Sequence, residues 1–140
     1  MFLGQFQGHI DAQGRFPLPP ALHPHLAPGM VVTRGLDRCL LLFSRQRWQE
    51  LAHRVSGLPL TLPQARSLRR LLFAGALDCL VDGEGCIALP EELRAYAEIE
   101  GELVLVGLGG YLEIWSPACW GEALTRLEAE ASSWAEELAI

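Results

Sequence analysis

Apolar residues occur along this chain in short runs bounded by glycine, proline and polar residues. Short apolar runs of about four or five residues with such boundaries predict β-strands. The runs form two similar groups, at residues 6–10, 15–18, 31–34 and 39–43, and again at residues 77–81, 86–89, 103–106 and 111–115. We therefore expect two groups of strands with the same order and similar spacing.

Helices are predicted next to these strands. Pro19-Pro20 and Pro90 favour the first turns of short helices that run to about residues 26 and 97, because a proline at a helix start removes an N–H that would have no partner. Ser44 and Ser116 can each cap a further helix. Strands and helices together predict the α+β class.

Two longer helices are predicted from their apolar stripes. Between the groups, Leu68, Leu71 and Leu72 recur at helical spacing, after Pro63 and before Gly75. After the second group, a long surface helix over residues 117–138 carries an apolar stripe, with acidic residues elsewhere: Trp120, Leu124, Leu127, Ala131 and Trp134. Trp134 could reach a neighbouring subunit.

The two groups of strands form an internal repeat. "DAQGRFPLP" (residues 11–19) and "DGEGCIALP" (residues 82–90) share the first Asp, the Gly at the fourth position, the Leu at the eighth position and the final Pro. "VVTRGLDRCLLLFSRQRW" from residue 31 aligns in the same way with "LVLVGLGGYLEIWSPACW" from residue 103. This predicts a tandem duplication, with a first unit at 1–56, a connecting helix at 57–74 and a second unit at 75–140.

The repeated turn separates structural residues from a candidate functional residue. Asp11, Gly14, Asp82 and Gly85 are explained by turn chemistry, since an Asp side chain accepts backbone N–H groups and Gly adopts positive φ. Each turn is expected to join two strands into a β-hairpin. Arg15 is not required by the turn, because its counterpart is Cys86. Two interpretations of Arg15 stay open: contact with a guanine or phosphate, or an ion pair with Asp11.

Charge is divided unevenly along the chain. Residues 1–70 contain nine Arg and three acidic residues, for a net charge of +6, whereas residues 71–140 contain two Arg and fourteen acidic residues, for a net charge of -12. A basic half next to an acidic half indicates either a polyanionic partner for the first half or attraction between neighbouring subunits.

Several classes of function find no support in the sequence. No apolar run approaches the roughly 20 residues that span a bilayer, and the start lacks a signal-peptide pattern, so we expect a cytoplasmic protein. The four cysteines have no C-x-x-C spacing, and His23 and His25 lack ligand company, so we expect neither a metal nor a cofactor. No nucleophile elbow, phosphate loop or H-E-x-x-H motif is present. We therefore expect no enzyme and no small-molecule substrate.

The motifs resemble those of known DNA-binding proteins. D-x-x-G-R followed by an apolar strand and Pro resembles the AbrB-type, swapped-hairpin proteins. The doubled form, with "TRGLDRCLLLF", "RRLLFAGA" and "VGLGGYLEIWS" in this order, resembles the MraZ family over nearly the whole chain. The resemblance implies two AbrB-like units interlocked about a pseudo-two-fold axis in one β-barrel-like domain with surface helices. It also implies a ring-like homo-oligomer.

The resemblance further implies a function and a site. It indicates a nucleoid-associated transcriptional regulator of double-stranded promoter DNA, which binds tandem repeats upstream of division and cell-wall genes. Arg15 is then the expected DNA contact, and Gln13 at the turn and His9 before it are further candidates. The second turn departs from the family pattern, because Glu84 would repel phosphate and Cys86 carries no positive charge. We therefore expect it to bind DNA poorly or not at all.

Other arginines are weaker candidates. Arg34 and Arg38 bracket "GLD" and fit a subunit interface, or ion pairs with Asp37, better than DNA contacts. Arg69 and Arg70 lie on the polar face of the connecting helix, either solvated or bridging to the acidic half of a neighbour. The alternative function is that of a ring-forming assembly or interaction protein with weak or lost DNA binding, which the acidic second half and Cys86 favour. The operator sequence, the number of subunits and the sign of regulation stay open.

Overall fold

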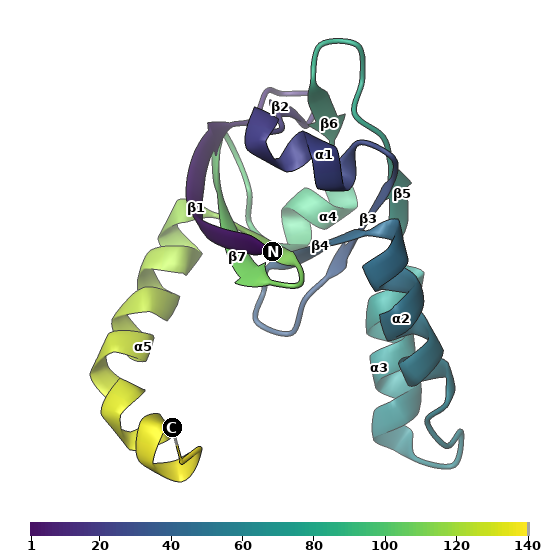
Figure 1. Ribbon diagram of the computed structural model, residues 1–140, viewed down its shortest axis with the longest axis vertical. Helices are drawn as coiled ribbons and strands as arrows, with labels where there is room; N and C mark the ends of the chain where they lie inside the picture. The colour runs from purple at the N-terminus through teal and green to yellow at the C-terminus, as the bar shows by residue number, and fades with distance from the viewer. Residues whose placement is uncertain (140) are drawn as a thin grey trace.

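Six strands form one antiparallel sheet in the computed structural model, which describes residues 1–139 (Figure 1). Across the sheet the order is β1 (Phe2–His9), β7 (Glu102–Gly109), β8 (Leu112–Trp115), β4 (Leu40–Ser44), β3 (Met30–Arg34) and β5 (Leu77–Cys79). A second sheet pairs β2 (Arg15–Pro17) with β6 (Cys86–Ala88). Together with the helices, this confirms the α+β class. The large sheet is open within residues 1–139, with edges at β1 and β5, so the barrel-like closure that the resemblance implied is not seen.

The two repeats pair extensively with each other. Four pairings join a strand of the first repeat to one of the second: β1 with β7, β2 with β6, β3 with β5 and β4 with β8. The prediction that residues 6–10 pair with 15–18, and 77–81 with 86–89, as local hairpins is wrong at the level of strand partners. β2 and β6 have three residues each, and their mutual pairing buries Phe16 opposite Ile87, each 1% exposed.

One face of the large sheet supplies the main core. Alternate residues of β4, β7 and β8 point to this face, because side chains in a strand alternate between the two faces: Leu40, Leu42, Leu103, Leu105, Leu112 and Ile114. The second sheet and the short helices cover them, with Phe16 and Leu89 among the covering side chains. The turns that precede β2 and β6 are thereby fixed on a packed core.

Short helices follow both repeated turns, as predicted. The first repeat has a 3₁₀ turn, η1 (Pro20–Leu22), followed by α1 (His23–Leu26), and the second has α4 (Glu91–Tyr96). Leu22, Leu26 and Leu93 are buried in the main core. These short helices lie close to the second sheet (Figure 1).

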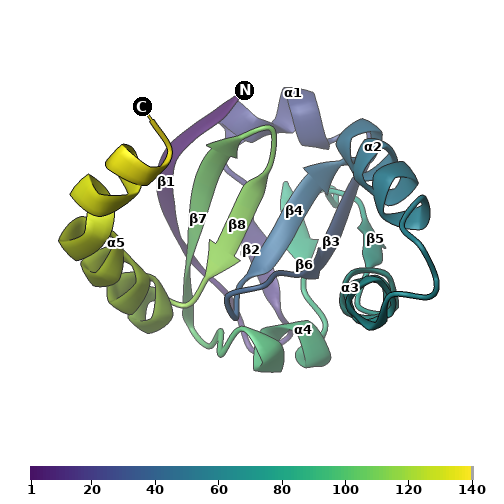
Figure 2. The same cartoon turned by 90° about the horizontal axis from the view of Figure 1, so that it is seen from below.

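The longer helices lie below the sheet in Figure 1, on the face opposite the main core. α2 (Arg45–Ser56) begins at Ser44, whose Oγ accepts the Arg47 N–H at 3.3 Å, and α5 (Pro117–Glu137) begins at Ser116, whose Oγ accepts the Cys119 N–H at 3.1 Å. Both predicted caps are thus confirmed. α3 (Pro63–Ala74) ends before Gly75, also as predicted. Figure 2 shows α2 and α3 on one side of the sheet, α5 on the other and the strands open to view between them. No helix within residues 1–139 has the length and apolar character needed to cross a membrane.

Candidate nucleic-acid interface

The two copies of the repeated turn form matching loops. Asp11 Oδ1 accepts the backbone N–H groups of Gln13 and Arg15, each at 2.9 Å. Asp82 Oδ1 accepts those of Glu84 at 2.9 Å and Cys86 at 3.0 Å. An Asp that accepts such bonds from its own turn replaces a backbone partner and fixes the loop.

The two loops are joined by reciprocal backbone bonds. The Leu89 N–H donates to the Gly14 carbonyl at 2.8 Å, and the Leu18 N–H donates to the Gly85 carbonyl at 2.9 Å. Gly14 and Gly85 have φ of +85° and +79°, which favours glycine at both positions. The equivalence of these bonds gives this end of the molecule a local pseudo-two-fold arrangement.

Arg15 reaches across to the second loop. Its Nη2 lies 2.7 Å from Asp82 Oδ2 and 3.4 Å from Glu84 Oε2, and its Nε donates to Asp82 Oδ2 at 3.2 Å. The expected alternative partner, Asp11, is therefore the wrong acid. The hydrogen bond from Arg15, followed by the backbone N–H groups of Cys86 and Glu84, lowers the pKa of Asp82 to about 2.

The second loop sends no equivalent cation back. Cys86 stands at the position of Arg15 and is half-buried. Asp11, Asp82 and Glu84 thus accompany a single arginine within the two loops. Since exposed charges of one sign repel a ligand of the same sign, the acidic residues oppose an approaching polyanion around Arg15.

Arg94 is a candidate that the sequence analysis missed. Its Nε donates to the Leu89 carbonyl at 3.0 Å, and its guanidinium covers Gly14, where an added Cβ would lie 3.2 Å from Cζ. In the first repeat, His23 Nε2 lies 2.8 Å from the Leu18 carbonyl. Both residues stand four positions after a repeated proline, Pro19 or Pro90, and this shared position could have revealed the pair. The first loop therefore has two guanidinium groups beside it.

Comparison with known proteins decides the family. A family model described as "MraZ protein, putative antitoxin-like" matches residues 1–71 and again residues 72–139. A protein of Roseiflexus castenholzii is 44% identical over 139 residues, 99% of this chain and 97% of the relative, and one of Thermomicrobium roseum is 45% identical over 139 residues, 99% and 98% of the two chains. One of Desulforamulus reducens is 38% identical over 138 residues, 99% and 97% of the two chains. All three are called "Transcriptional regulator MraZ".

The chain belongs to the MraZ family. The resemblance seen in the motifs is thereby confirmed, and both repeats fall within it. These relatives are regulators and not enzymes, which confirms the prediction that the chain is not an enzyme.

The polar candidates near the first loop are exposed. The side chain of His9 is 87% exposed, and its Nδ1 lies 4.0 Å from Glu102 Oε1. Gln13 is exposed at the turn, two residues before Arg15. His9 precedes the Arg15 loop and Gln13 lies within it, and both are accessible to a ligand.

Two of the other candidate arginines, Arg34 and Arg69, form hydrogen bonds within the fold. Arg34 donates to the carbonyls of Leu71 and Arg70 at 3.0 and 2.8 Å, and so satisfies groups at the end of α3. Arg69 Nη2 donates to the Ser56 and Leu58 carbonyls at 2.9 and 2.6 Å. The bonds of Arg69 join α3 to the last residue of α2 and to the segment that follows it. Arg70 itself is exposed.

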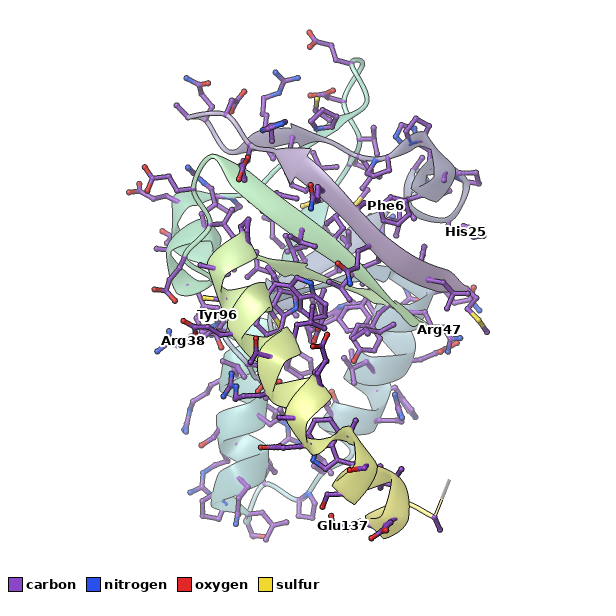
Figure 3. The ribbon with its side chains drawn as sticks, turned by 90° about the vertical axis from the view of Figure 1, so that its left-hand side faces the viewer. Phe6, His25, Arg38, Arg47, Tyr96 and Glu137 are labelled. Carbon is purple, nitrogen blue, oxygen red and sulfur yellow. The ribbon has the colours of Figure 1, made fainter. Side chains whose placement is uncertain are left out.

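Arg38 makes a contact of a different kind. Its Cζ lies 5.1 Å from the centre of the Tyr96 ring (Figure 3), a distance suited to a cation–π interaction. The structure thus gives Arg34 and Arg38 partners other than Asp37, the acid expected from the sequence.

Metal-binding chemistry is not assembled in the part of the chain that the structure describes. No three His, Cys, Asp or Glu side chains of residues 1–139 lie together as a ligand set. Cys39, Cys79, Cys86 and Cys119 are free thiols, and burial raises the pKa of Cys39 to about 12 and that of Cys79 to about 11. The neutral thiols of Cys39 and Cys79 are poor ligands and poor nucleophiles.

Proposed function

We propose that this chain is a DNA-binding transcriptional regulator, and that the two joined loops are the end that contacts double-stranded promoter DNA. The observation that carries the proposal is the placement of Arg15, which leaves one loop, is held by the other and remains 37% exposed. Membership of a family with regulators among its members supports the same function.

Asp82 can act as a support for the arginine that meets DNA. It accepts bonds from Nε and Nη2 of Arg15, and Nη1 makes no hydrogen bond with the described residues. A guanidinium has five N–H groups in a fixed plane, so Nη1 can donate to a phosphate oxygen or a guanine while Asp82 holds the side chain. Gln13 and His9 would contact the same DNA from the exposed positions beside it. Arg94, next to Gly14, would add a second positive charge.

The energy available from one such contact requires several copies of the chain. A good bidentate base contact discriminates by about 1–3 kcal/mol, which is less than a regulator needs against genomic DNA. Simultaneous binding of several subunits supplies the rest, since linked sites raise the effective concentration of each other. We therefore propose a ring-like homo-oligomer in the nucleoid, bound to tandem repeats upstream of division and cell-wall genes.

The AbrB-like part of the proposal concerns the arrangement of the repeats. We propose that the units at 1–56 and 75–140, joined by 57–74, are two AbrB-like units that interlock as swapped hairpins do. The exchange of strands between the repeats supports this arrangement.

A second candidate function is that of an assembly or interaction protein with weak or lost DNA binding. Its support is the acidic surrounding of the single arginine, namely Asp11, Asp82 and Glu84, together with Cys86 at the counterpart position. In that case Arg15 would serve to join the two loops.

Fluorescence anisotropy with a labelled duplex from the region upstream of this gene separates the two functions. Arg15→Ala is compared with Arg66→Ala, which removes the same charge from the first turn of α3, at the end of that helix far from the loops (Figure 1). We expect Arg15→Ala to lose binding and Arg66→Ala to keep it. Equal affinity of both variants and the unmodified chain would refute the assignment of Arg15.

A further inference from the structure

A cavity of about 640 Å³ lies where four segments of the chain meet. Its walls come from the start of β1, from α1 and the turn after it, from the first turn of α2 and from the β7–β8 hairpin. Two of its residues, His25 and Arg47, lie at the same edge of the molecule, below the joined loops (Figure 3). The volume falls within the range of about 300–1,000 Å³ that is typical of small-molecule sites.

The ionisable side chains in the walls of this cavity are all basic. They are His25, Arg45 and Arg47, and no acidic side chain within residues 1–139 lines the cavity. Asp78 and Glu50 pair with the two arginines from outside the walls, at 3.4 and 3.2 Å, and all four of these side chains are at least half exposed. Because exposed ion pairs contribute little, they leave the cavity attractive to an anion.

Each of the two arginines lies over a glycine in the wall of the cavity. A Cβ at Gly29 would lie 2.7 Å from Arg45 Cζ, and a Cβ at Gly110 would lie 3.4 Å from Arg47 Cζ. The glycines therefore leave room for a guanidinium group on two walls. Each guanidinium has five N–H groups, of which one donates to a described side chain. The other N–H groups can bind a phosphate, a favoured partner of arginine.

The uncharged groups of the cavity suit the rest of an organic phosphate. Ser44 Oγ accepts the Arg47 N–H at 3.3 Å, so the Ser44 O–H remains a donor for a ligand. The ring of His25 lies 5.6 Å from that of Phe2, centre to centre, with 84° between the ring planes. Phe2 is buried in the main core, whereas His25 is exposed. His25 is therefore a ring, supported by the core, on which a nucleobase can stack.

We propose that this cavity binds a free nucleotide as a ligand and not as a substrate. Arg45 and Arg47 bind its phosphates, and His25 stacks on its base. Phosphates and bases also occur together in DNA, but a duplex is too wide to enter a cavity of about 640 Å³ between four wall segments, whereas a mononucleotide fits there. The site is separate from the joined loops, and the proposal does not depend on the DNA contact proposed for Arg15.

Isothermal titration calorimetry of the full chain with ATP at low salt tests the site. Arg45→Ala and Arg47→Ala should each weaken ATP binding about tenfold or more, because each removes charge-assisted hydrogen bonds. The control is Arg54→Ala, which removes the same charge from α2 outside this cavity and should keep the affinity. His25→Ala should weaken the binding of ATP and leave that of pyrophosphate unchanged. Circular dichroism verifies that all variants are folded.

Three outcomes would overturn the proposal. One is that the unmodified chain binds no ATP, and another is that Arg45→Ala binds it as tightly as Arg54→Ala does. The third is that pyrophosphate binds as tightly as ATP, which would leave an anion site without a contact to the base. The anisotropy assay with the duplex gives the remaining comparison, in which Arg45→Ala should keep the DNA affinity of the unmodified chain. A loss of DNA affinity in Arg45→Ala, without ATP binding to the unmodified chain, would assign the cavity to phosphates of DNA instead.

Discussion

Glycines in the two loops allow a graded test of how the loops are joined. Gly14, Gly83 and Gly85 are each replaced by Ala. A Cβ at Gly14 would lie 2.2 Å from the Leu89 carbonyl oxygen, in addition to the cost of φ +85°. At Gly85, with φ +79°, the nearest atom is Cε1 of His23 at 3.5 Å, and at Gly83 no atom lies within 4 Å.

The expected losses follow from these surroundings. Gly83→Ala should be neutral or stabilising by up to about 1 kcal/mol, because it restricts the unfolded chain. Gly85→Ala should cost about 1–2 kcal/mol, the penalty of a left-handed backbone for an L-residue. Gly14→Ala adds a clash with backbone, comparable to overpacking at roughly 1–3 kcal/mol, and weakens the bond from the Leu89 N–H. Its total loss should be about 2–5 kcal/mol.

The free energy of unfolding is measured by urea titration with circular dichroism, at one fixed protein concentration because assembly would add stability. The predicted order of stability is Gly83→Ala above Gly85→Ala above Gly14→Ala. If Gly14→Ala lost no more stability than Gly85→Ala, the close contact between the first loop and Leu89 would be refuted.

Two further predictions concern the arginine positions. In Arg15→Ala, an NMR titration should show the pKa of Asp82 above its value of about 2, because the first cause of its lowering is removed; an unchanged pKa would contradict the ion pair. The stability that the lowered pKa of Asp82 contributes is fully present above pH 3.8 and is lost as the pH falls to about 2. Between these pH values, Arg15→Ala should therefore lose less stability than the unmodified chain. Cys86→Arg should place a guanidinium by the pseudo-two-fold counterpart, Asp11, and raise DNA affinity with a salt slope steeper by about one phosphate contact; unchanged binding would mean that the second loop does not face DNA.

Local features of the fold were predictable because local chemistry decides them. The caps at Ser44 and Ser116 and the helix between Pro63 and Gly75 were read from single residues and their neighbours.

Three strands of the second half were predicted to within two residues of their observed ends, whereas β7 continues to Gly109, beyond the predicted end at residue 106. These strands were recognisable because short apolar runs bounded by turn residues are typical of strands. In β7 the run is continuous because both faces are covered: Leu103 and Leu105 lie in the main core, and Val104 and Val106 lie in the cluster on the opposite face.

The partners of the strands could not be read in the same way. Periodicity shows that residues 6–10 form a strand but does not show which strand they pair with. β1 pairs with β7 from Phe2 to His9, and so begins earlier than predicted. The pairing between the repeats is long-range, and in the second sheet it buries Phe16 opposite Ile87.

The same limit applied to the candidate site. Arg15 could be recognised as a candidate from the sequence alone, because the second repeat has Cys86 at the equivalent position. Its partner was expected in its own turn at Asp11, whereas the exchange of strands brings Asp82 and Glu84 to it. Arg34 and Arg38 likewise contact residues that are distant in the sequence, namely the carbonyls near the end of α3 and the ring of Tyr96. The signal for Arg94 lies outside the repeated turn, because it stands four residues after Pro90, as His23 does after Pro19.

The salt dependence of DNA binding tests the central claim most directly. The dissociation constant for the upstream duplex is measured over a series of salt concentrations, for the unmodified chain and for Arg15→Ala. Contacts with phosphates make the logarithm of the association constant fall linearly with the logarithm of the salt concentration, with a slope of about 0.9 per phosphate contacted. We predict a linear fall for the unmodified chain, and a loss of both affinity and slope in Arg15→Ala. Absence of salt-dependent binding, or the same slope and affinity in both proteins, would contradict the assignment of the joined loops as the DNA-binding end.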